Sequence, residues 1–334
     1  MNVLFIGGTG IISSACVELA VARGIDLTLL NRGHGTRPLP ASVAVLQGDI
    51  RDKDAVANVL KDKTFDVVVD FVAFTPEHIE TDLALFRGRT KQYIFISSAS
   101  AYQTPPRNWP TTESTPLRNP YWAYSRAKIA CEERLMEAYR EEGFPLTIVR
   151  PSHTYDARSL PFHEGYTFVD RMRAGKKVIV HGDGSSLWVL THHRDFAKGF
   201  VGLLGNVHAL GEAIHITSDE VLNWNQIVDI VADAAGVQAQ IVYIPSERIA
   251  AYDVAWGAGL LGDKAHSMVF DNSKIKRLVP EYVATIPFSQ GAAEIIAWYD
   301  SHPSAQKVDA ALNQLLDTMI GDYEATGPRT RGAA

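Results

Sequence analysis

Only two cysteines, Cys16 and Cys131, occur in the chain of 334 residues, and both fall in segments with helical periodicity. So few thiols argue against a disulfide framework and against a cysteine-based metal site. His181, His192 and His193 lie at no familiar ligand spacing from an acid or a thiol, so no metal is expected. We expect both cysteines to be small core residues.

Basic residues are also outnumbered. Lys and Arg number 32 against 38 Asp and Glu, which gives a net charge of −6. Binding along a nucleic-acid backbone needs Lys and Arg clustered on one face. No nucleic-acid partner is therefore expected.

Long apolar runs are missing as well. The first residues, MNVLFIGG, lack the basic segment and the apolar length of a signal peptide, and no window is long enough to span a bilayer. Hydrophobic residues make up 46% of the chain and charged residues 21%, which is ordinary for a soluble globular protein. We expect a cytoplasmic protein without a membrane partner.

What the sequence does contain, over residues 3–151, is a regular alternation of short apolar runs and amphipathic segments. The helical segments include Ile11–Arg23 and Tyr121–Glu142, which end at Gly24 and Gly143. The expected strands are Val3–Ile6, Leu27–Leu30, Val43–Gln47, Val67–Val72, Tyr93–Ser97 and Leu146–Val149. Such alternation predicts an α/β fold, a Rossmann-like doubly wound parallel sheet with helices on both faces.

Beyond Pro151 the alternation weakens, which indicates a smaller C-terminal lobe. Further elements are expected at Phe168–Ala174, Val178–His181, Ala213–Thr217, Asn223–Ala235, Gln240–Ile244, 272–279, 288–300 and 306–322. The expected division is a dinucleotide-binding domain over 1–151, to which 189–220 returns, and a substrate-binding lobe over 152–188 and 221–323. Residues 324–334 are expected to be a disordered tail.

A glycine-rich turn, Gly7-Gly8-Thr9-Gly10-Ile11-Ile12-Ser13, follows the first strand directly. Glycines stand where the turn is tight and where backbone must approach a pyrophosphate, so the turn predicts dinucleotide binding. Ser13 replaces the third glycine of the pattern, and its small size still permits close helix–sheet packing.

The second strand ends in Asn31 and Arg32, where an acid that binds the adenosine ribose of NAD would normally stand. Arg32 can meet a 2′-phosphate, which favours NADP, whereas Asn31 can bind an unmodified ribose. The alternative is that Arg32 is an ordinary solvated arginine. Asp49, after the third strand, can accept a hydrogen bond from adenine or can cap the next helix; the spacing alone leaves both open.

Tyr124 and Lys128 are four residues apart on one helix, so they project from the same face. A phenol titrates near pH ~10, and a neighbouring ammonium lowers its pKa toward the range useful for proton transfer. Ser98 follows the fifth strand, at the carboxyl edge where ligands bind in such sheets. Ser98 can bind the reacting oxygen while Tyr124 moves its proton, so we predict Ser98, Tyr124 and Lys128 as a catalytic trio.

With these motifs the chain, over roughly residues 2–300, resembles the extended short-chain dehydrogenases/reductases, the NAD-dependent epimerase/dehydratase family. The resemblance is carried by the glycine turn, Asp49, Phe71-Val72-Ala73, Ser98 with Tyr102, Glu113, Pro116, Pro120, Tyr124-Ser125-Arg126-Ala127-Lys128 and Arg150-Pro151. It implies that Asp49 contacts adenine and that Lys128 also binds the nicotinamide ribose. The expected cofactor contacts, to NADP or NAD, are Gly7, Thr9, Gly10, Ile11, Ile12, Asn31, Arg32, Asp49, Ile50, Phe71, Val72, Ala73, Ser97, Tyr124, Lys128, Pro151 and His153. The expected substrate contacts are Ser100, His153 and Trp188.

The departures from the family pattern bear on the substrate. The segment between Phe71 and Ser98 is shorter than in typical sugar-nucleotide epimerases and resembles that of plastid stem-loop RNA-binding relatives. Trp188 stands where many family members have an arginine that binds the substrate diphosphate. His153 stands where many have an asparagine near the substrate phosphates. The leading hypothesis is hydride transfer at a secondary alcohol or ketone of a sugar or nucleotide-sugar-like substrate. The alternatives are an NADP-dependent carbonyl reductase and an RNA-associated protein that retains a dinucleotide.

The remaining predictions concern assembly and one acid. Ile129, Leu135 and Met136 on the helix of Tyr124 are expected to extend an apolar face into a homodimer interface. Asp195 is expected to be an N-cap or first-turn acid of the helix that follows it.

Overall fold

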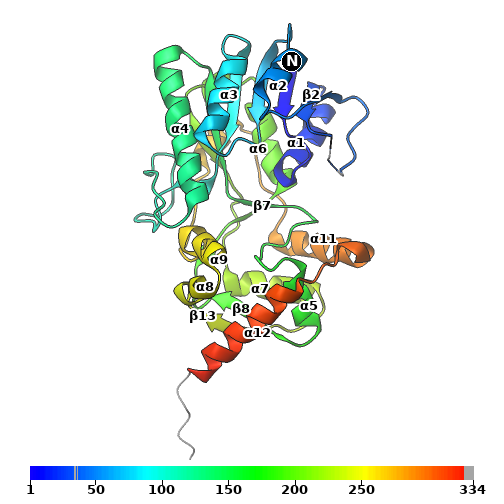
Figure 1. The fold of residues 1–334 in the computed structure, drawn as a ribbon, viewed down its shortest axis with the longest axis vertical. Coiled ribbons are helices and arrows are strands. Elements are labelled where there is room, and N and C mark those ends of the chain that lie inside the picture. Colours follow the sequence, from blue (N-terminus) through cyan, green and yellow to red (C-terminus); the bar gives the residue numbers. More distant parts are fainter. Residues whose placement is uncertain (34, 36, 327–334) are drawn as a thin grey trace, which may run out of the picture. The chain divides into compact units, whose positions relative to one another are not determined.

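The computed structural model describes residues 1–33, 35 and 37–326, and the chain divides into two compact units. The first unit contains Met1–Asp156, Val189–Val221 and Met268–Pro287. The second contains Ala157–Trp188, Leu222–Ser267 and Phe288–Ala334. Each unit is built around its own sheet and helices (Figure 1).

The first unit contains a seven-stranded sheet in the order β11-β6-β5-β4-β1-β2-β3, and all its neighbouring strands are parallel. Its strands are β1 (Asn2–Ile6), β2 (Asp26–Asn31), β3 (Ala44–Gln47), β4 (Phe65–Asp70), β5 (Thr90–Ile96), β6 (Leu146–Pro151) and β11 (Ala213–Ile216). The order reverses between β1 and β4, so that the carboxyl ends of these strands open a crevice for ligands. The predicted doubly wound Rossmann-like sheet is confirmed.

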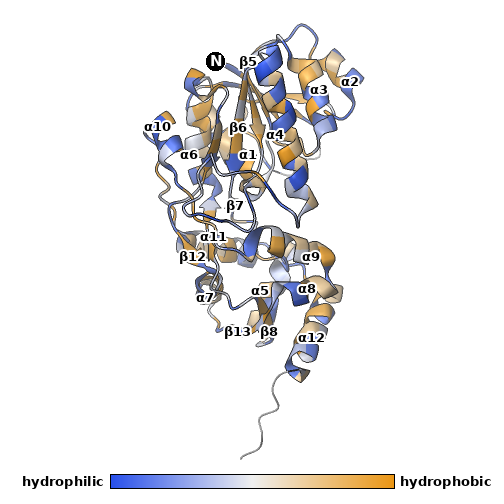
Figure 2. Ribbon diagram, turned by 90° about the vertical axis from the view of Figure 1, so that its left-hand side faces the viewer, coloured by the Kyte–Doolittle hydropathy of each residue, from blue (hydrophilic) through white to orange (hydrophobic). Residues whose placement is uncertain are grey.

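The helices of this unit cover both faces of the sheet. They are α1 (Ile11–Ala22), α2 (Lys53–Val59), α3 (Pro76–Phe86), α4 (Ala123–Glu142), α6 (His193–Leu203) and α10 (Ser273–Leu278). Short elements are the 3₁₀ turns Ala99–Ala101 and Val207–Ala209 and the paired strands β7 (His153–Tyr155) and β10 (Leu190–His192). Figure 2 colours the strands around β5 and β6 mostly as hydrophobic, as expected for a sheet buried on both faces.

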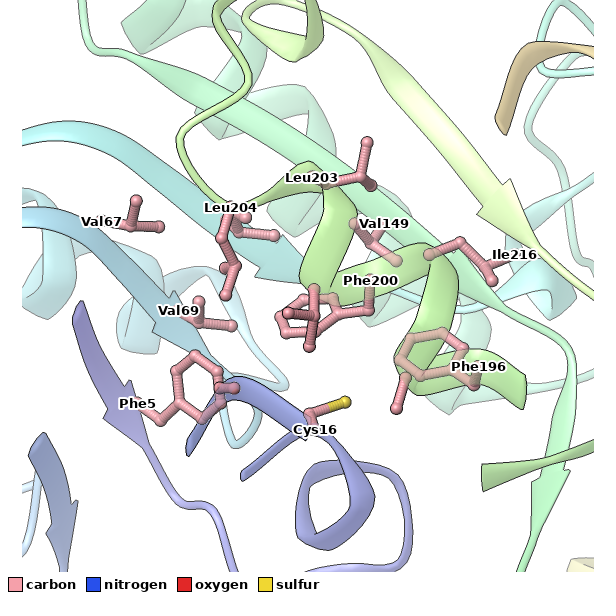
Figure 3. Packing of buried hydrophobic residues seen from close by; sticks show 14 of the residues in the cluster. Phe5, Cys16, Val67, Val69, Val149, Phe196, Phe200, Leu203, Leu204 and Ile216 are labelled. Atoms are coloured by element: carbon pink, nitrogen blue, oxygen red, sulfur yellow. The ribbon is translucent and has the colours of Figure 1, made fainter. Parts of the chain in front are cut away.

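Alternate residues of β1 supply two separate cores. Val3 and Phe5 pack with α1 and α6, where Phe5 and Phe200 meet edge to face at 5.9 Å between ring centroids (Figure 3). Leu4 and Ile6 face the other side and pack with residues of α2, α3 and α4. Cys16 and Cys131 are buried in the first and second of these cores. The period of two along a strand therefore fixes which helices lie on which face.

The second unit combines short strands with helices. Its strands are β8 (Lys177–His181) paired with β13 (Gln240–Ile244), and β9 (Leu187–Trp188) paired with β12 (Leu222–Asn223). Its helices are α5 (Tyr166–Arg173), α7 (Trp224–Ala234), α8 (Ser246–Tyr252), α9 (Val254–Gly259), α11 (Phe288–Ser301) and α12 (Ala310–Ala325), with a π-helical turn at Leu260–Lys264 and a 3₁₀ turn at Pro303–Ala305. Helices α8 and α9 are not foreseen in the sequence.

One segment assigned to the C-terminal lobe belongs to the first unit. Residues 268–287 were predicted to lie in the C-terminal lobe, with 221–323. They belong instead to the first unit, where Ile275, Val279 and Tyr282 pack in the core of α1 and α6. The Tyr282 hydroxyl donates a hydrogen bond of 2.8 Å to the carbonyl of Thr217. An amphipathic helix shows that it has a buried face but not which core buries it, so the pattern alone did not place this segment.

Two smaller predictions are corrected at helix α12 and at α4. Glu324, expected in a disordered tail, continues α12 and forms an ion pair with Lys177; residues 327–334 lie outside the described residues. Leu135, expected at a homodimer interface, is fully buried in the core of its own chain, and Met136 packs against the same core. Over the described residues, none of the helices combines the length and the apolar character that crossing a membrane requires.

Candidate active site

The glycine turn after β1 has the backbone geometry that its sequence predicts. Gly7 and Gly8 have φ angles of +100° and +108°, values that side chains rarely tolerate. A Cβ atom on Gly8 would lie 2.8 Å from Leu29 Cδ2, so bulk is excluded there as well. Gly10 is the N-cap of α1, and its amide donates a 2.9 Å hydrogen bond to the hydroxyl of Ser13. Ser13 therefore replaces the third glycine and also closes the turn.

A cavity of about 360 Å³ opens beside this turn at the carboxyl ends of β1, β2 and β3. Seven of the residues predicted to contact the cofactor line it: Gly7, Thr9, Asn31, Arg32, Asp49, Ile50 and Val72. The lining residues that sequence reasoning missed are Ile6, Leu30, Gly35, Gly48, Arg51 and Phe74. A cavity of this size at the switch point of a parallel sheet is where a nucleotide binds in such folds.

The polar side chains at the edge of this cavity are fixed by hydrogen bonds from main-chain amides. The side-chain oxygen of Asn31 accepts a 2.9 Å hydrogen bond from the amide of Gly33, and Asp49 accepts one of 3.0 Å from the amide of Arg51. The helix cap considered for Asp49 is instead supplied by Asp52, which accepts from the amide of Ala55 at 3.1 Å. Because the capping role is taken by Asp52, Asp49 remains at the cavity wall.

Lys128 on α4 is tied to the ends of two strands. Its ammonium donates to the carbonyl of Ala73, after β4, at 2.6 Å and to the carbonyl of Ile96, the last residue of β5, at 2.7 Å. It also lies 4.6 Å from the ring centroid of Phe74 and 5.9 Å from that of Tyr124. Burial lowers the pKa of Lys128 to about 8, and Asp70 opposes that shift. A lysine so placed is a rigid cation beside Tyr124.

Ser98 is joined to the same helix through hydroxyl groups. Its Oγ lies 2.9 Å from Ser100 Oγ and accepts a hydrogen bond of 3.2 Å from the amide of Ser100. Ser125, the neighbour of Tyr124, donates to Ser100 Oγ at 2.8 Å, and the amide group of Asn119 donates to the Ser100 carbonyl at 2.9 Å. The structure thereby connects Ser98 with the helix of Tyr124 and Lys128.

A buried ion pair next to Ser97 was not predicted from the sequence. Arg150 on β6 donates to both carboxylate oxygens of Glu132, from Nε at 2.9 Å and from Nη2 at 2.6 Å. Glu132 also accepts a hydrogen bond from the hydroxyl of Ser97, whose side chain is buried. Arg150 further stacks 4.8 Å from the ring centroid of Tyr102. Glu132 lies four residues after Lys128 on α4. This spacing places both residues on one face of the helix and was the sign in the sequence that Glu132 lies near the candidate site.

Other predicted site residues have distinct surroundings. Phe71 packs its ring against Phe5 and Phe200, at centroid distances of 5.2 and 5.5 Å, so its side chain faces the core. Pro151 is buried at the end of β6, and His153 is half-buried on β7. Ile12 packs against the core of α1, whereas Ile11 is exposed.

Trp188 belongs to the second unit, where its buried ring lies 5.8 Å from that of Trp224 and 5.7 Å from Lys264 Nζ. Asp195 stands in the first turn of α6, one of the two places expected for it, and accepts from the amides of Thr285 and Ile286 at 3.0 and 2.8 Å. Among the described residues, no group of three or more His, Cys, Asp or Glu side chains is arranged to hold a metal ion.

Known proteins resemble this chain in sequence over most of its length. A 2′-dehydrokanamycin reductase of Streptomyces kanamyceticus is 25% identical over 84% of this chain and 80% of its own. A UDP-glucose 4-epimerase of Lactobacillus helveticus is 25% identical over 91% and 98% of the two chains. The chloroplast stem-loop binding protein of 41 kDa b of Arabidopsis thaliana is 28% identical over 74% and 67%.

The fold is similar to that of solved structures as well. An epimerase of Methanothermobacter thermautotrophicus superposes with a TM-score of 0.75 at 18% identity, over 91% of this chain and 93% of that one. The family described as the NAD dependent epimerase/dehydratase family matches residues 3–217. The resemblance found in the sequence is thereby confirmed: this chain belongs to the NAD-dependent epimerase/dehydratase family and is an enzyme that uses NAD or NADP.

Proposed function

We propose that the enzyme transfers hydride at a secondary alcohol or ketone carbon of a sugar or nucleotide-sugar-like substrate. The observation that carries the proposal is the fixed position of Lys128, whose ammonium is bonded to the carbonyls of Ala73 and Ile96 next to the ring of Tyr124. A buried cation beside a phenol favours the phenolate. This arrangement suits proton transfer at a carbon–oxygen bond.

Tyr124, Lys128 and Ser98 have different roles at one substrate oxygen. Tyr124 takes the proton when a hydroxyl is oxidised and returns it when a carbonyl is reduced. Lys128 lowers the pKa of the phenol by its charge. Ser98 donates a hydrogen bond to the reacting oxygen, while Ser100, held by Ser125 and Asn119, keeps Ser98 in place.

The cavity beside the glycine turn fits the adenosine end of a nicotinamide dinucleotide. Gly7 and Gly8 carry no side chain that could stand between the backbone of the turn and a phosphate. Arg32 lines the same cavity and would meet a 2′-phosphate, with Asn31 and Asp49 toward the ribose and the adenine. When bound, the nicotinamide supplies the hydride acceptor or donor.

The test is turnover with and without the phenol hydroxyl. We expect Tyr124→Phe to keep its cofactor affinity and to lose about a hundredfold or more in turnover, the scale of a positioned acid–base group. Tyr139→Phe, on the same helix and exposed, is the matched control and should stay at the wild-type rate. Candidate substrates come from mass spectrometry of small molecules that co-purify with the protein. Full activity of Tyr124→Phe would end the proposal.

A simple NADP-dependent reductase is the second candidate function, favoured by the similarity to a reductase that acts on 2′-dehydrokanamycin. The two candidates differ in the fate of the cofactor. An epimerase or a dehydratase regenerates it within each turnover, whereas a reductase consumes one NADPH per product. Absorbance of the reduced nicotinamide during turnover separates them: a steady fall with product identifies the reductase.

The proposal also covers location, assembly and partners: a cytoplasmic homodimer that binds a small molecule and does not need nucleic acid. Light scattering during size-exclusion chromatography tests the dimer. Filter binding of RNA at about physiological salt tests whether the protein binds nucleic acid. We expect only weak, salt-sensitive retention, because the net charge is −6. Tight RNA binding would favour the RNA-associated alternative, which the similarity to a chloroplast stem-loop binding protein keeps relevant.

A further inference from the structure

Two aspartates are buried in the interior of the first unit. Asp70 is the last residue of β4, Asp82 belongs to α3, and neither has any exposed surface. Asp70 raises the pKa of Asp82 by its charge and through a side-chain hydrogen bond, so the two carboxyl groups are neighbours. Buried carboxylates are rare because desolvation of each charge is costly, and two together repel each other. The catalytic roles described above do not use this pair.

Each aspartate is bonded through one oxygen. Asp82 Oδ2 accepts a 2.5 Å hydrogen bond from the hydroxyl of Tyr93, and Asp70 Oδ1 accepts from the amides of Val72 and Ala73, the latter at 2.7 Å. The second oxygens, Asp70 Oδ2 and Asp82 Oδ1, have no donor. Two facing acids with one unsatisfied oxygen each need a proton between them, because unsatisfied buried acceptors are costly.

The pair is connected to the candidate catalytic lysine. Asp70 fixes the amide of Ala73, and the carbonyl of the same Ala73 accepts from Lys128 Nζ at 2.6 Å. Asp70 and Lys128 are therefore bonded to the same residue, one to its amide and the other to its carbonyl. Asp70 also acts on Lys128 by its charge, which favours the ammonium.

We propose that Asp82 holds a proton that it donates to Asp70, and that the negative charge of Asp70 positions Lys128 and keeps it an ammonium ion. The importance of that ion for catalysis rests on the function proposed above. Burial and the neighbouring Asp70 raise the pKa of Asp82 well above its ordinary value, in agreement with a proton held there. The other titratable or charged groups that act on these residues are Arg51, His78, Tyr93, Cys131 and Glu132, and Glu77 acts on His78 and Cys131 in turn.

Infrared difference spectroscopy at pH 7 between wild type and Asp82→Asn tests whether the pair carries a proton. We expect the carbonyl band of a protonated, slowly exchanging carboxyl group to be lost in Asp82→Asn. Asp66→Asn, which changes a partly exposed aspartate on the same strand, is the control and should retain the band. A spectrum of Asp82→Asn with no lost band would overturn the proton on Asp82. Should that variant not fold, Tyr93→Phe gives the same answer: the band must shift in frequency, since its oxygen loses a donor, and an unshifted band refutes the proposal.

The charge is tested by the pKa of Lys128, followed from the side-chain nitrogen in ¹⁵N NMR with Lys128→Met to assign the signal. Asp70→Asn retains the shape and the hydrogen-bonding capacity of the acid but removes the charge, and it should lower the pKa of Lys128 by about one unit or more. Asp82→Asn should leave that pKa nearly unchanged, because Asp82 is the protonated, neutral member of the pair and the charge of Asp70 remains. Equal shifts in both variants, or none in either, contradict a pair with a single charge. Neither readout needs a substrate, so a failure here is distinct from a failure of the proposed function.

Discussion

At the scale of single residues, the candidate site depends on groups whose partners are main-chain atoms. Lys128 is bonded to the carbonyls of Ala73 and Ile96, and Asp70 to the amides of Val72 and Ala73. Sequence motifs identify such residues by type and spacing, as they did for Lys128. They do not identify Asp70 and Asp82, because the two acids are twelve positions apart and meet only when α3 packs on the sheet.

The choice between the two cofactors is also decided by single residues. We expect NADP(H) to bind at least as tightly as NAD(H), and Arg32→Ala to weaken NADP(H) roughly tenfold or more, since charge-assisted bonds to a phosphate are lost. Affinity for NAD(H) should change little. Calorimetric titration of both cofactors measures this, with Arg23→Ala, whose side chain pairs with Glu281, as the control. A preference for NAD(H) that survives Arg32→Ala would refute the role of Arg32.

At the scale of elements, the glycine turn offers a comparison between strain and crowding. Gly8 and Gly24 both have positive φ angles, of +108° and +72°, but only at Gly8 would a Cβ meet neighbouring atoms. Gly8→Ala should therefore cost about 1–3 kcal/mol in the free energy of unfolding and weaken cofactor binding. Gly24→Ala should cost less and leave cofactor binding unchanged. Urea unfolding and calorimetry measure both effects; equal losses of affinity would contradict this account.

Most elements of the first unit were predictable because their periodicities are strong. Strands β1, β2, β4, β5 and β6 begin and end close to the expected residues. Seven predicted cofactor residues line one cavity, since the order of strands and glycines already places them at one edge. The Ser97–Glu132–Arg150 network was not predictable in the same way, because its members come from three elements whose distances only the packed fold sets.

At the scale of the whole molecule, stability should depend on buried histidines. Burial lowers the pKa of His181 to about 4, whereas an unfolded chain binds that proton near pH ~6.5. The unfolded state therefore binds more protons between these values, and the free energy of unfolding should fall by about 3 kcal/mol as the pH drops from ~6.5 to ~4. His193, whose pKa burial also lowers to about 4, acts in the same direction.

Urea unfolding at several pH values measures this dependence. Tryptophan fluorescence is a suitable probe, because the ring of Trp224 lies 4.9 Å from that of His181. His181→Gln should flatten the acid side of the profile. His208→Gln, which changes an exposed histidine, should leave it as in wild type. An identical slope in His181→Gln would show that another group is responsible.

The bonds of Lys128 to two carbonyl oxygens have a consequence for divergence among relatives. Every residue type presents the same carbonyl, so substitutions at Ala73 or Ile96 alter the walls around the lysine without removing its acceptors. The candidate catalytic lysine therefore keeps its acceptors when the residues that surround it change. Under the proposed function, the side chains around Lys128 can then be exchanged to suit a different substrate without loss of its two acceptors.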